Sequence, residues 1–358
     1  MGIKNLTKLL NEQTPDAIDK VRLNQLKGKK VAIDTSIILY QYVTAIRSSG
    51  SDLKNANNES TSHIMGILVK TLNCLKAGII PIHIFDGNPS ELKLNILKDR
   101  SKIKKDAISK LLKLEEELAT NQTTIDEQNK LEQKKITLLK QSVSINKKEI
   151  AEAFEIVELL GVPAFYAKEE ADSQCAYMSI NGLVDYVATE DMDLLTFGTK
   201  KIIKNFMKST MHMIELDQIL SDGDITMAEF IDICILLGCD YTDTIEGIGY
   251  KKAWTLIKKY STIDKLITTD KNIIMHKYVL PDNFKYIESR EYFNNPRHNI
   301  INEEELRLRK PDLNQLKKLL IEKYSFEEET IEKMIKFLRV KYKIYDLSYK
   351  EKDPFIDD

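Results

Sequence analysis

The sequence lacks the marks of secreted and membrane proteins. No apolar run approaches the roughly 20 residues that a membrane-spanning helix needs. The N-terminal stretch MGIKNLT has no apolar signal-peptide core. The cysteines form no CxxC pair, and none stands near a histidine at zinc-finger spacing, which favours buried, reduced thiols. We therefore expect an intracellular protein without a membrane partner.

Several catalytic and binding signatures are also missing. There is no GxSxG elbow, and the five histidines show no metal-ligand spacing, so nothing supports a covalent nucleophile. The net charge is −2, whereas a DNA-binding protein usually carries a basic footprint. Lysines nevertheless crowd residues 93–113 and 134–148. Charged patches rather than the total charge therefore decide what this chain binds.

Glycine and proline are absent between Pro89 and Gly161. This stretch is rich in Lys, Glu, Leu and Ile at roughly helical spacing, which predicts a helical insertion. Its middle, residues 119–124, is polar and is predicted to be a mobile tip. The plainer alternative is a solvated helical hairpin without a binding role. Because these helices carry charge on most faces, we expect them to bury little apolar surface by themselves and to be mobile until a partner orders them.

Acidic residues follow several short β-branched runs. VAID ends at Asp34, IPIHIFD ends at Asp86, and VDYVATEDMD runs through Asp191 and Asp193. In an open parallel sheet, side chains at the carboxyl ends of the strands converge on one crevice. Clustered carboxylates ionise together only when hard cations neutralise them, and oxygen ligands favour magnesium or manganese over zinc. The pattern predicts a catalytic metal site.

The order of the apolar runs predicts an α/β fold. Residues 31–85 give strand, helix and strand, with the helix over 62–76, which is a βαβ unit. A helix over 148–160 ends at Gly161 and Pro163, and the runs VPAFYA, VDYVAT, KIIKNF and MHMIEL follow it. We expect both halves to share a central, mostly parallel sheet with helices on both faces.

A glycine loop follows Asp240. In EGIGYKKAW, Gly247 and Gly249 allow backbone amides to approach a phosphate, and Lys251 and Lys252 open the next helix, whose N-terminus favours anions. The arrangement predicts a helix-two-turn-helix that grips a DNA backbone.

Capping patterns mark two more helices. Thr226 and Glu229 form a capping box before MAEFIDICILL, which Gly238 ends. Ser325 and Glu328 predict the start of a helix near the C-terminus, and the final stretch YDLSYKEKDPFIDD is predicted to be a loosely ordered tail.

Taken together, the motifs resemble the flap endonuclease family of structure-specific 5′ nucleases. MGIKNL, KVAIDTS, TSHIMGIL, IFDG, LKDRS, ATEDMDLLTFG, ICILLGCDY and IEGIGYKKA occur in the family's order and at its spacings, between Met1 and Phe337. Each motif alone is weak, but the ordered set is specific. The resemblance implies a PIN-like fold with a helical arch insertion and a helix-two-turn-helix DNA clamp.

The resemblance also implies a division of the chain. We expect an N-terminal nuclease region at 1–100, the arch at 101–148, an internal nuclease region at 149–240, the helix-two-turn-helix region at 241–310, and C-terminal helices with a tail at 311–358.

Carried over by position, the resemblance assigns metal coordination to seven acids. These are Asp34, Asp86, Glu170, Asp172, Asp191, Asp193 and Asp240. It implies two Mg²⁺ ions per site, with Mn²⁺ as a possible substitute. The family usually has glutamate where Asp172 stands, and for this acid alone a solvated loop residue is the main alternative.

Two basic residues and one aromatic residue are implied to act at the scissile phosphate. Lys93 and Arg100 lie seven residues apart, close to two helical turns, and therefore on one face of the helix that opens the insertion. There they would neutralise charge that grows in the transition state. Tyr40 corresponds to an aromatic that stacks on a base beside the cleavage point, and its alternative is an ordinary core-facing tyrosine.

Further DNA contacts are implied at Gly2, Arg47 and Lys70, besides the glycine loop and its lysines. Gly2 is small enough for the backbone to come close to the active site. Lys70 stands where arginine is usual, so a bidentate phosphate contact is not expected there.

The resemblance also implies a potassium ion in the DNA clamp. It would bind backbone carbonyls around Thr244, Ile245 and Ile248. Tyr250 replaces the proline that is common after GIG, which loosens the expected turn.

The implied function is magnesium-dependent hydrolysis of DNA at 5′ flaps and related branched or nicked duplexes, with 5′-to-3′ exonuclease activity, in replication and repair. One alternative is a relative acting mainly as an exonuclease or on bubbles. Another is a non-catalytic DNA-junction binding protein, which the complete acid set disfavours. A sugar-phosphate phosphatase would use a similar acid pair but leaves GIGYKK unexplained.

Partners and location follow from the same resemblance. We expect a monomer at sites of DNA replication, in a nucleus or at a viral replication site. The chain ends at Asp358 without the glutamine and paired-aromatic motif that docks cellular members on a sliding clamp, so binding to that clamp is not inferred.

Overall fold

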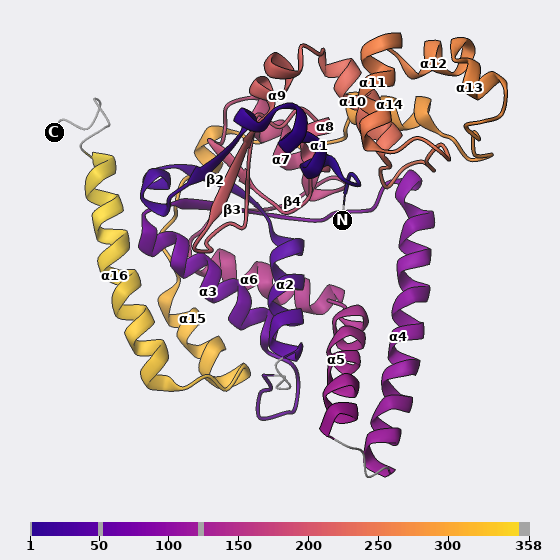
Figure 1. Cartoon of the computed structure of the whole chain (residues 1–358). Coiled ribbons are helices and arrows are strands. Elements are labelled where there is room, and N and C mark those ends of the chain that lie inside the picture. The colour runs from indigo at the N-terminus through magenta and orange to yellow at the C-terminus, as the bar shows by residue number, and fades with distance from the viewer. Residues whose placement is uncertain (1, 49–52, 121–124, 351–358) are drawn as a thin grey trace. The chain divides into compact units, whose positions relative to one another are not determined.

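The computed structural model describes residues 2–48, 53–120 and 125–350 (Figure 1). The chain divides into two compact units. Unit 1 comprises Met1–Ile37, Ala77–Ser101 and Phe165–Glu303. Unit 2 comprises Ile38–Lys76, Lys102–Ala164 and Glu304–Asp358. Each unit is therefore assembled from distant parts of the sequence.

A seven-stranded sheet organises unit 1, in the order β1-β7-β6-β5-β2-β3-β4. The strands are β1 (Ile18–Val21), β2 (Lys30–Asp34), β3 (Ile80–Phe85), β4 (Ala164–Tyr166), β5 (Tyr186–Ala188), β6 (Lys201–Lys204) and β7 (Met211–Glu215). Strands β3, β2, β5 and β6 run parallel, whereas β7 and β1 pair antiparallel at one edge. The predicted α/β fold with a mostly parallel centre is confirmed.

A strand is easier to predict from the sequence when its residues are buried. In β2, Val31 to Asp34 are all buried, as expected for a central parallel strand covered on both faces. Strand β1 was not predicted, because its sequence IDKV places the charged, exposed Asp19 and Lys20 in the middle of a short segment.

The helices of unit 1 are α1 (Leu6–Gln13), α7 (Ala171–Ile180), α8 (Asp193–Thr196), α9 (Leu216–Gly223), α10 (Met227–Leu237), α11 (Tyr250–Tyr260), α12 (Ile263–Thr269), α13 (Lys271–Ile274) and α14 (Tyr286–Asn294). Helix α7 packs on β2, β3 and β5, and α10 packs on α11 and α14. The predicted capping box of α10 is confirmed, because the side chains of Thr226 and Glu229 accept each other's backbone N–H. Gly238 ends the helix with φ +104°.

The helices of unit 2 are α3 (Ser62–Ala77), α5 (Ile125–Ser142), α6 (Lys147–Leu159), α15 (Leu313–Lys318) and α16 (Glu328–Lys350), with most of α2 (Thr35–Ser48) and α4 (Leu94–Thr120). A π-helical turn at Leu319–Lys323 follows α15. Asn146 and Glu149 form a capping box that starts α6. Residues 121–124 of the predicted mobile tip lie outside the described residues.

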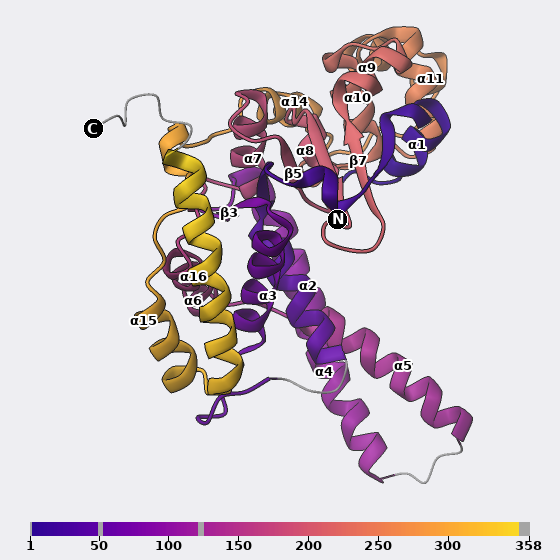
Figure 2. The ribbon, with the colours of Figure 1, turned by 90° about the vertical axis from the view of Figure 1, so that its left-hand side faces the viewer.

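Helices α4 and α5 form a hairpin, and Figures 1 and 2 both show them side by side. Ala107, Leu114 and Leu138 are buried between them, with Leu111 and Leu131 packed against this cluster. The insertion, which was predicted to bury little apolar surface by itself, thus has a small buried cluster between its two helices, while Ile103 and Leu112 are exposed. Lysines between these positions hid an apolar seam at helical spacing, which holds the two helices together.

The predicted helix near the C-terminus is present, but Ser325 does not cap it. Ser325 has φ +58°, and its hydroxyl accepts the N–H of Ala56 instead of capping a helix. Helix α16 begins at Glu328 and runs to Lys350, so the first part of the predicted tail is helical. Residues 351–358 lie outside the described residues.

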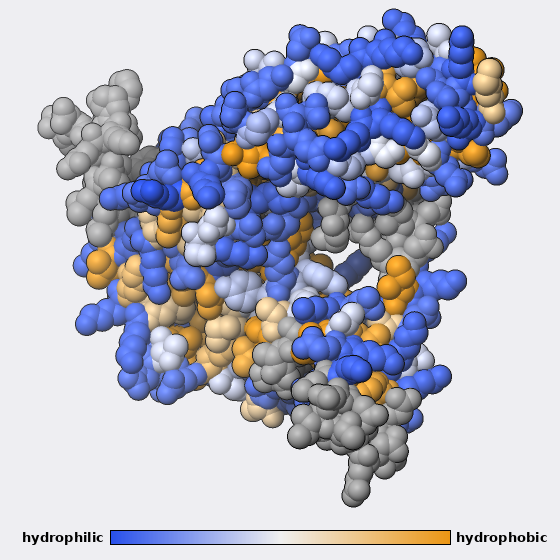
Figure 3. Space-filling view, in the orientation of Figure 1, coloured by the Kyte–Doolittle hydropathy of each residue, from blue (hydrophilic) through white to orange (hydrophobic). Residues whose placement is uncertain are grey.

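The face of the molecule in Figure 3 is mostly hydrophilic, with apolar side chains gathered at its lower left. No helix among the described residues is both long and apolar enough to cross a membrane.

Candidate active site

Three adjacent parallel strands deliver acids to one edge of the sheet. Strand β2 ends at Asp34, Asp86 directly follows β3, and Asp191 and Asp193 follow β5. Because β5, β2 and β3 are neighbours and run parallel, their carboxyl ends lie together. As predicted from the strand ends, these four acids lie together in unit 1.

Two helices complete the set. Glu170 is the N-cap residue of α7, and Asp172 lies in its first turn. Asp240 follows α10, two residues after Gly238. Electrostatic interactions link Asp34 to Asp86 and Asp191, link Asp172 to Asp34 and Glu170, and link Asp193 to Asp191 and Asp240. All seven predicted acids thus belong to one group, here called the acid cluster.

Three carboxyl groups of the acid cluster have raised pKa values. Burial, followed by repulsion from Asp86 and Asp191, raises the pKa of Asp34 to about 8. Burial and neighbouring carboxylates also raise the pKa of Asp172 and of Asp193 well above their usual value. Within the described residues, Asp172 Oδ1 and Asp193 Oδ1 are buried without a hydrogen-bond partner. Such oxygens suit a hard cation, which would supply both the missing charge and the missing partner.

The donor set fits Mg²⁺ or Mn²⁺ in its chemistry, since the acid cluster offers carboxylate oxygens, the ligands that these hard cations favour. Among the residues that the structure describes, no three His, Cys, Asp or Glu side chains form a ready-made metal-binding group.

Within the described part of the structure, Lys93 pairs with the acid cluster. It ends a 3₁₀ turn at Glu91–Lys93, one residue before α4, so the expected place inside a continuous α-helix with Arg100 was wrong. Its Nζ lies 2.5 Å from Glu170 Oε2. Burial alone would lower the pKa of Lys93, but attraction to Glu170, Asp172 and Asp240 outweighs this and raises it. Lys93 therefore stays charged at the acids.

Sequence reasoning missed three residues that contact Glu170. Ser90 lies 3.2 Å from Oε1, Tyr292 lies 3.3 Å from Oε1, and Tyr241 lies 3.3 Å from Oε2. Tyr241 directly follows Asp240, which was a usable signal. Ser90 and Tyr292 stand 80 and 122 positions from Glu170, and nothing in their local sequence marks them.

Gly2 lies against the acids, as expected from its small size. It has φ +81°, and a Cβ added there would stand 1.9 Å from Asp191 Oδ1 and 2.7 Å from Asp193 Oδ1. Any larger residue would have to displace these carboxylates.

The glycine loop before α11 is held by its neighbours. Gly247 has φ +89°, and an added Cβ would meet the ring of Tyr278 at 2.8 Å, whereas Gly249 is the N-cap of α11. Lys252 Nζ donates to the Gly247 carbonyl at 2.8 Å and lies 4.8 Å from the centre of the Tyr278 ring. These contacts fix the predicted phosphate loop.

Helix α1 is tied to the start of α11. Lys251 pairs with Glu12 at 3.1 Å, and the Tyr250 hydroxyl donates to the same carboxylate at 2.8 Å. Tyr250 therefore anchors the turn in which a loosening was expected. In the predicted potassium loop, the Ile248 amide donates to the Ile245 carbonyl at 3.3 Å, and Thr244 precedes them.

The remaining predicted residues belong to unit 2 or to side chains outside the described part. The Tyr40 hydroxyl donates to the Lys140 carbonyl at 3.2 Å, and the tyrosine is 37% exposed rather than core-facing. Lys70 is buried on α3. The side chains of Arg47 and Arg100 lie outside the described part of the structure.

Comparison with known proteins identifies the family. The XPG N-terminal domain model matches residues 1–107, and the XPG I-region model matches residues 161–240. Flap endonuclease 1 of Aedes aegypti is 38% identical over 338 residues, covering 92% of this chain and 84% of that protein. The chain belongs to the flap endonuclease family. Family membership sets the sugar-phosphate phosphatase alternative aside.

Other members of the family are longer or more distant. Flap endonuclease 1 of Plasmodium chabaudi chabaudi is 38% identical, covering 92% of this chain and 69% of that protein, whereas the chain spans 56% of the Plasmodium knowlesi relative. The structure of flap endonuclease-1 from Methanococcus jannaschii has a TM-score of 0.66 at 29% identity, covering 90% of this chain and 95% of that one. The catalytic core of Rad2 in complex with DNA substrate reaches 0.69 at 22% identity, covering 94% and 100%, which concerns the fold alone.

Proposed function

We propose that this chain is a structure-specific 5′ flap endonuclease with 5′-to-3′ exonuclease activity that hydrolyses DNA phosphodiesters with Mg²⁺. The observation that carries the proposal is the acid cluster with Lys93 beside it, in a chain of this family. Its site of action would be DNA replication and repair, on branched or nicked DNA with 5′ flaps.

The acid cluster would hold two Mg²⁺ ions. When bound, such ions supply an activated water and stabilise the leaving 3′ oxygen. The protein's own part is to aim its carboxylates at one point, to keep Lys93 charged for the scissile phosphate, and to bring the backbone at Gly2 close to Asp191 and Asp193. Mn²⁺ would substitute, since it accepts the same oxygen ligands.

The glycine loop would grip the DNA backbone away from the reaction. Gly249 N-caps α11, so the first backbone N–H groups of that helix are suited to a phosphate. We also propose that carbonyls around Thr244, Ile245 and Ile248 bind K⁺ there. If so, replacing K⁺ with Li⁺ at constant ionic strength should weaken flap binding, and unchanged binding would remove the potassium site from the proposal.

The α4–α5 hairpin would select free 5′ ends by admitting the single strand. A bulky protein on the 5′ end, attached before the enzyme is added, should then suppress cutting strongly, while the same block on the 3′ end should not. Equal cutting of both substrates would leave the hairpin as a plain DNA-binding element.

The decisive assay is a labelled 5′ flap duplex incubated with Mg²⁺ or with EDTA. A magnesium-dependent cut at the flap base supports the proposal. Tight binding without any cut would favour the non-catalytic junction binder, and stepwise loss of 5′ nucleotides alone would favour a dedicated exonuclease.

A further inference from the structure

The carboxylate of Glu170 is held by four donors. Oε2 accepts from Lys93 and Tyr241, while Oε1 accepts from Ser90 and Tyr292. An ionised carboxylate offers about four acceptor positions on its two oxygens. The four donors therefore fix both the direction and the rotation of this group.

Glu170 does not cap the helix that it begins. Ser, Thr, Asp and Asn at an N-cap often accept a backbone N–H from the first turn of the helix, whereas glutamate is not a favoured capping residue. Within the described residues, the Glu170 side chain makes no such bond, and the Ala171 amide donates to Asp86 instead at 2.9 Å. The carboxylate is therefore held by its four side-chain donors and not by the helix N-terminus.

Two of the four donors, Tyr241 and Tyr292, belong to a packed group of aromatic rings. The Tyr241 and Tyr292 ring centres lie 4.8 Å apart, and both rings also pack against a further aromatic ring, Phe293 for Tyr241 at 5.3 Å and Phe197 for Tyr292 at 5.7 Å. This packing leaves each ring little freedom, so each hydroxyl is presented at a fixed point. Tyr292 also lies 3.4 Å from Glu169, so its single proton serves one of two carboxylates at a time.

We propose that Tyr292, together with Tyr241, is a positioning residue for the reaction. The two hydroxyls hold the Glu170 carboxylate turned toward Lys93, and Glu170 in turn holds the Lys93 ammonium at the acid cluster. The tyrosines thus act on the scissile phosphate through Glu170 and Lys93. This inference rests on the proposed nuclease function and gives a role to Tyr292, which lies in no quoted sequence motif, and to Tyr241, to which the motif ICILLGCDY assigned none.

The test removes one hydroxyl and keeps the ring. Tyr292→Phe should lower the single-turnover cleavage rate of a saturating flap about tenfold, while the flap Kd in Ca²⁺ stays within about twofold. Tyr286→Phe is the matched control, because it lies on the same helix α14 and donates to Asp264 at 3.0 Å, a carboxylate outside the acid cluster. Its cleavage rate should stay within about twofold of the parent chain.

A double-mutant cycle separates positioning from a loss of packing. In a Glu170→Ala background, Tyr292→Phe should cause no further loss of rate, because the hydroxyl acts through the carboxylate. An equal loss in both backgrounds would show a merely structural effect and overturn the inference.

A readout without DNA keeps the inference separate from the proposed function. Lysines labelled by reductive ¹³C-methylation give NMR signals, and Lys93→Arg identifies the signal of Lys93. That signal should shift in Tyr292→Phe and stay in place in Tyr286→Phe. If the parent chain cuts no flap, the nuclease proposal fails, whereas an unchanged Lys93 signal in Tyr292→Phe contradicts the positioning role whatever the activity.

Discussion

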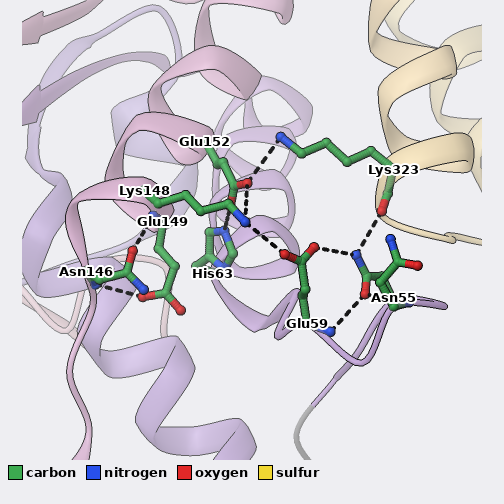
Figure 4. A network of polar contacts seen from close by, with 9 residues as sticks. Asn55, Glu59, His63, Asn146, Lys148, Glu149, Glu152 and Lys323 are labelled. Carbon is green, nitrogen blue, oxygen red and sulfur yellow. Dashed lines mark hydrogen bonds and ion pairs between the residues drawn. The ribbon is translucent and has the colours of Figure 1, made fainter.

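Two polar clusters in this molecule handle charge in opposite ways. Among the described side chains, the acid cluster of unit 1 brings seven carboxylates together, and Lys93 is the cation paired with them. Figure 4 shows a second cluster in unit 2, in which acids and lysines alternate. It is called the unit 2 network and consists of Asn55, Glu59, His63, Asn146, Lys148, Glu149, Glu152 and Lys323.

Ion pairs in the unit 2 network join its two lysines to Glu59 and Glu152. Glu152 accepts from His63 at 2.9 Å and pairs with Lys323 at 3.1 Å, and Lys148 pairs with Glu59 at 2.8 Å. Hydrogen bonding to Lys148 lowers the pKa of Glu59, and Glu59 raises the pKa of Lys148. The charged form of each group is therefore more stable here than it would be in water.

The opposite pKa shifts in the two clusters indicate which of them serves the reaction. In the unit 2 network, the pKa shifts of Glu59 and Lys148 favour their charged forms, which suits a structural brace between α3, α6 and the C-terminal segment, whereas burial of His63 opposes its charged form. In the acid cluster, the pKa shifts of Asp34, Asp172 and Asp193 oppose ionisation, so a further cation beside these acids would favour their charged forms. A group of acids kept in that condition suits a site whose neutralising partner arrives from solution.

The largest effect is expected for Asp191→Asn, which removes one charge from the acid cluster and keeps the size. Cleavage in Mg²⁺ should fall about 100-fold or more, while flap binding in Ca²⁺ persists, because the clamp is untouched. Glu59→Gln makes the same chemical change in the unit 2 network and should leave cleavage unchanged. Near-normal turnover of Asp191→Asn would contradict the assignment of this acid.

Lys93 at the acid cluster and Lys251 after the glycine loop should have different roles, one in catalysis and one in DNA binding. Lys93→Ala should lower the single-turnover rate about 10- to 100-fold with a small effect on binding, because its charge counts most in the transition state. Lys251→Ala should instead weaken binding and reduce the salt dependence of the binding constant by about one ion. Measured rates and affinities that change alike in both variants would refute this division of roles.

Gly2→Ala should lower cleavage about tenfold, because its Cβ would stand 1.9 Å from Asp191 Oδ1 and force the carboxylate to move. Gly28→Ala is a fair control. It has a similar φ of +78°, yet no described atom lies within 4 Å of its added Cβ. It should cost stability through backbone strain while leaving single-turnover cleavage intact. A similar loss of cleavage in both variants would show that strain, not the collision, is responsible.

The two clusters should also respond to pH with opposite signs. The pKa of Asp34 is raised from 3.8 to about 8 by burial and its acidic neighbours, so in EDTA its contribution to stability falls as the pH rises from about 4 to 8. Burial lowers the pKa of His63 below 6.5, so its contribution is lost as the pH falls below that value.

Thermal melting against pH in EDTA checks both signs. Asp34→Asn should flatten the decline toward alkaline pH, and His63→Gln should flatten the decline toward acid pH. Parallel curves for the parent chain and both variants would mean that neither group governs stability.

The sequence predicted the acids better than their surroundings. Asp34, Asp86 and Asp191 follow strands, and the ends of parallel strands meet by a rule that local pattern reveals. The contact between Tyr292 and Glu170 joins residues 122 positions apart, and no periodicity encodes it. The same holds for Ser325, whose local sequence suggests a cap while its hydroxyl accepts the distant Ala56 amide.

Apolar seams in charged helices were equally hidden from the sequence. Leu111 and Leu131 pack in the α4–α5 hairpin, but the lysines around them indicate a solvated face when helix partners are unknown. The sheet centre was easier, because buried parallel strands leave continuous apolar runs.

Melting of the DNA-free protein at pH 8, with and without Mg²⁺, tests most directly whether the acid cluster awaits a cation. We expect Mg²⁺ to raise Tm by a few degrees, since for a chain of this length each added kcal/mol of stability moves Tm by roughly 1 °C. Asp193→Asn should begin with a higher Tm in EDTA and lose most of this rise. Equal Tm values for the parent chain in Mg²⁺ and in EDTA would contradict the account.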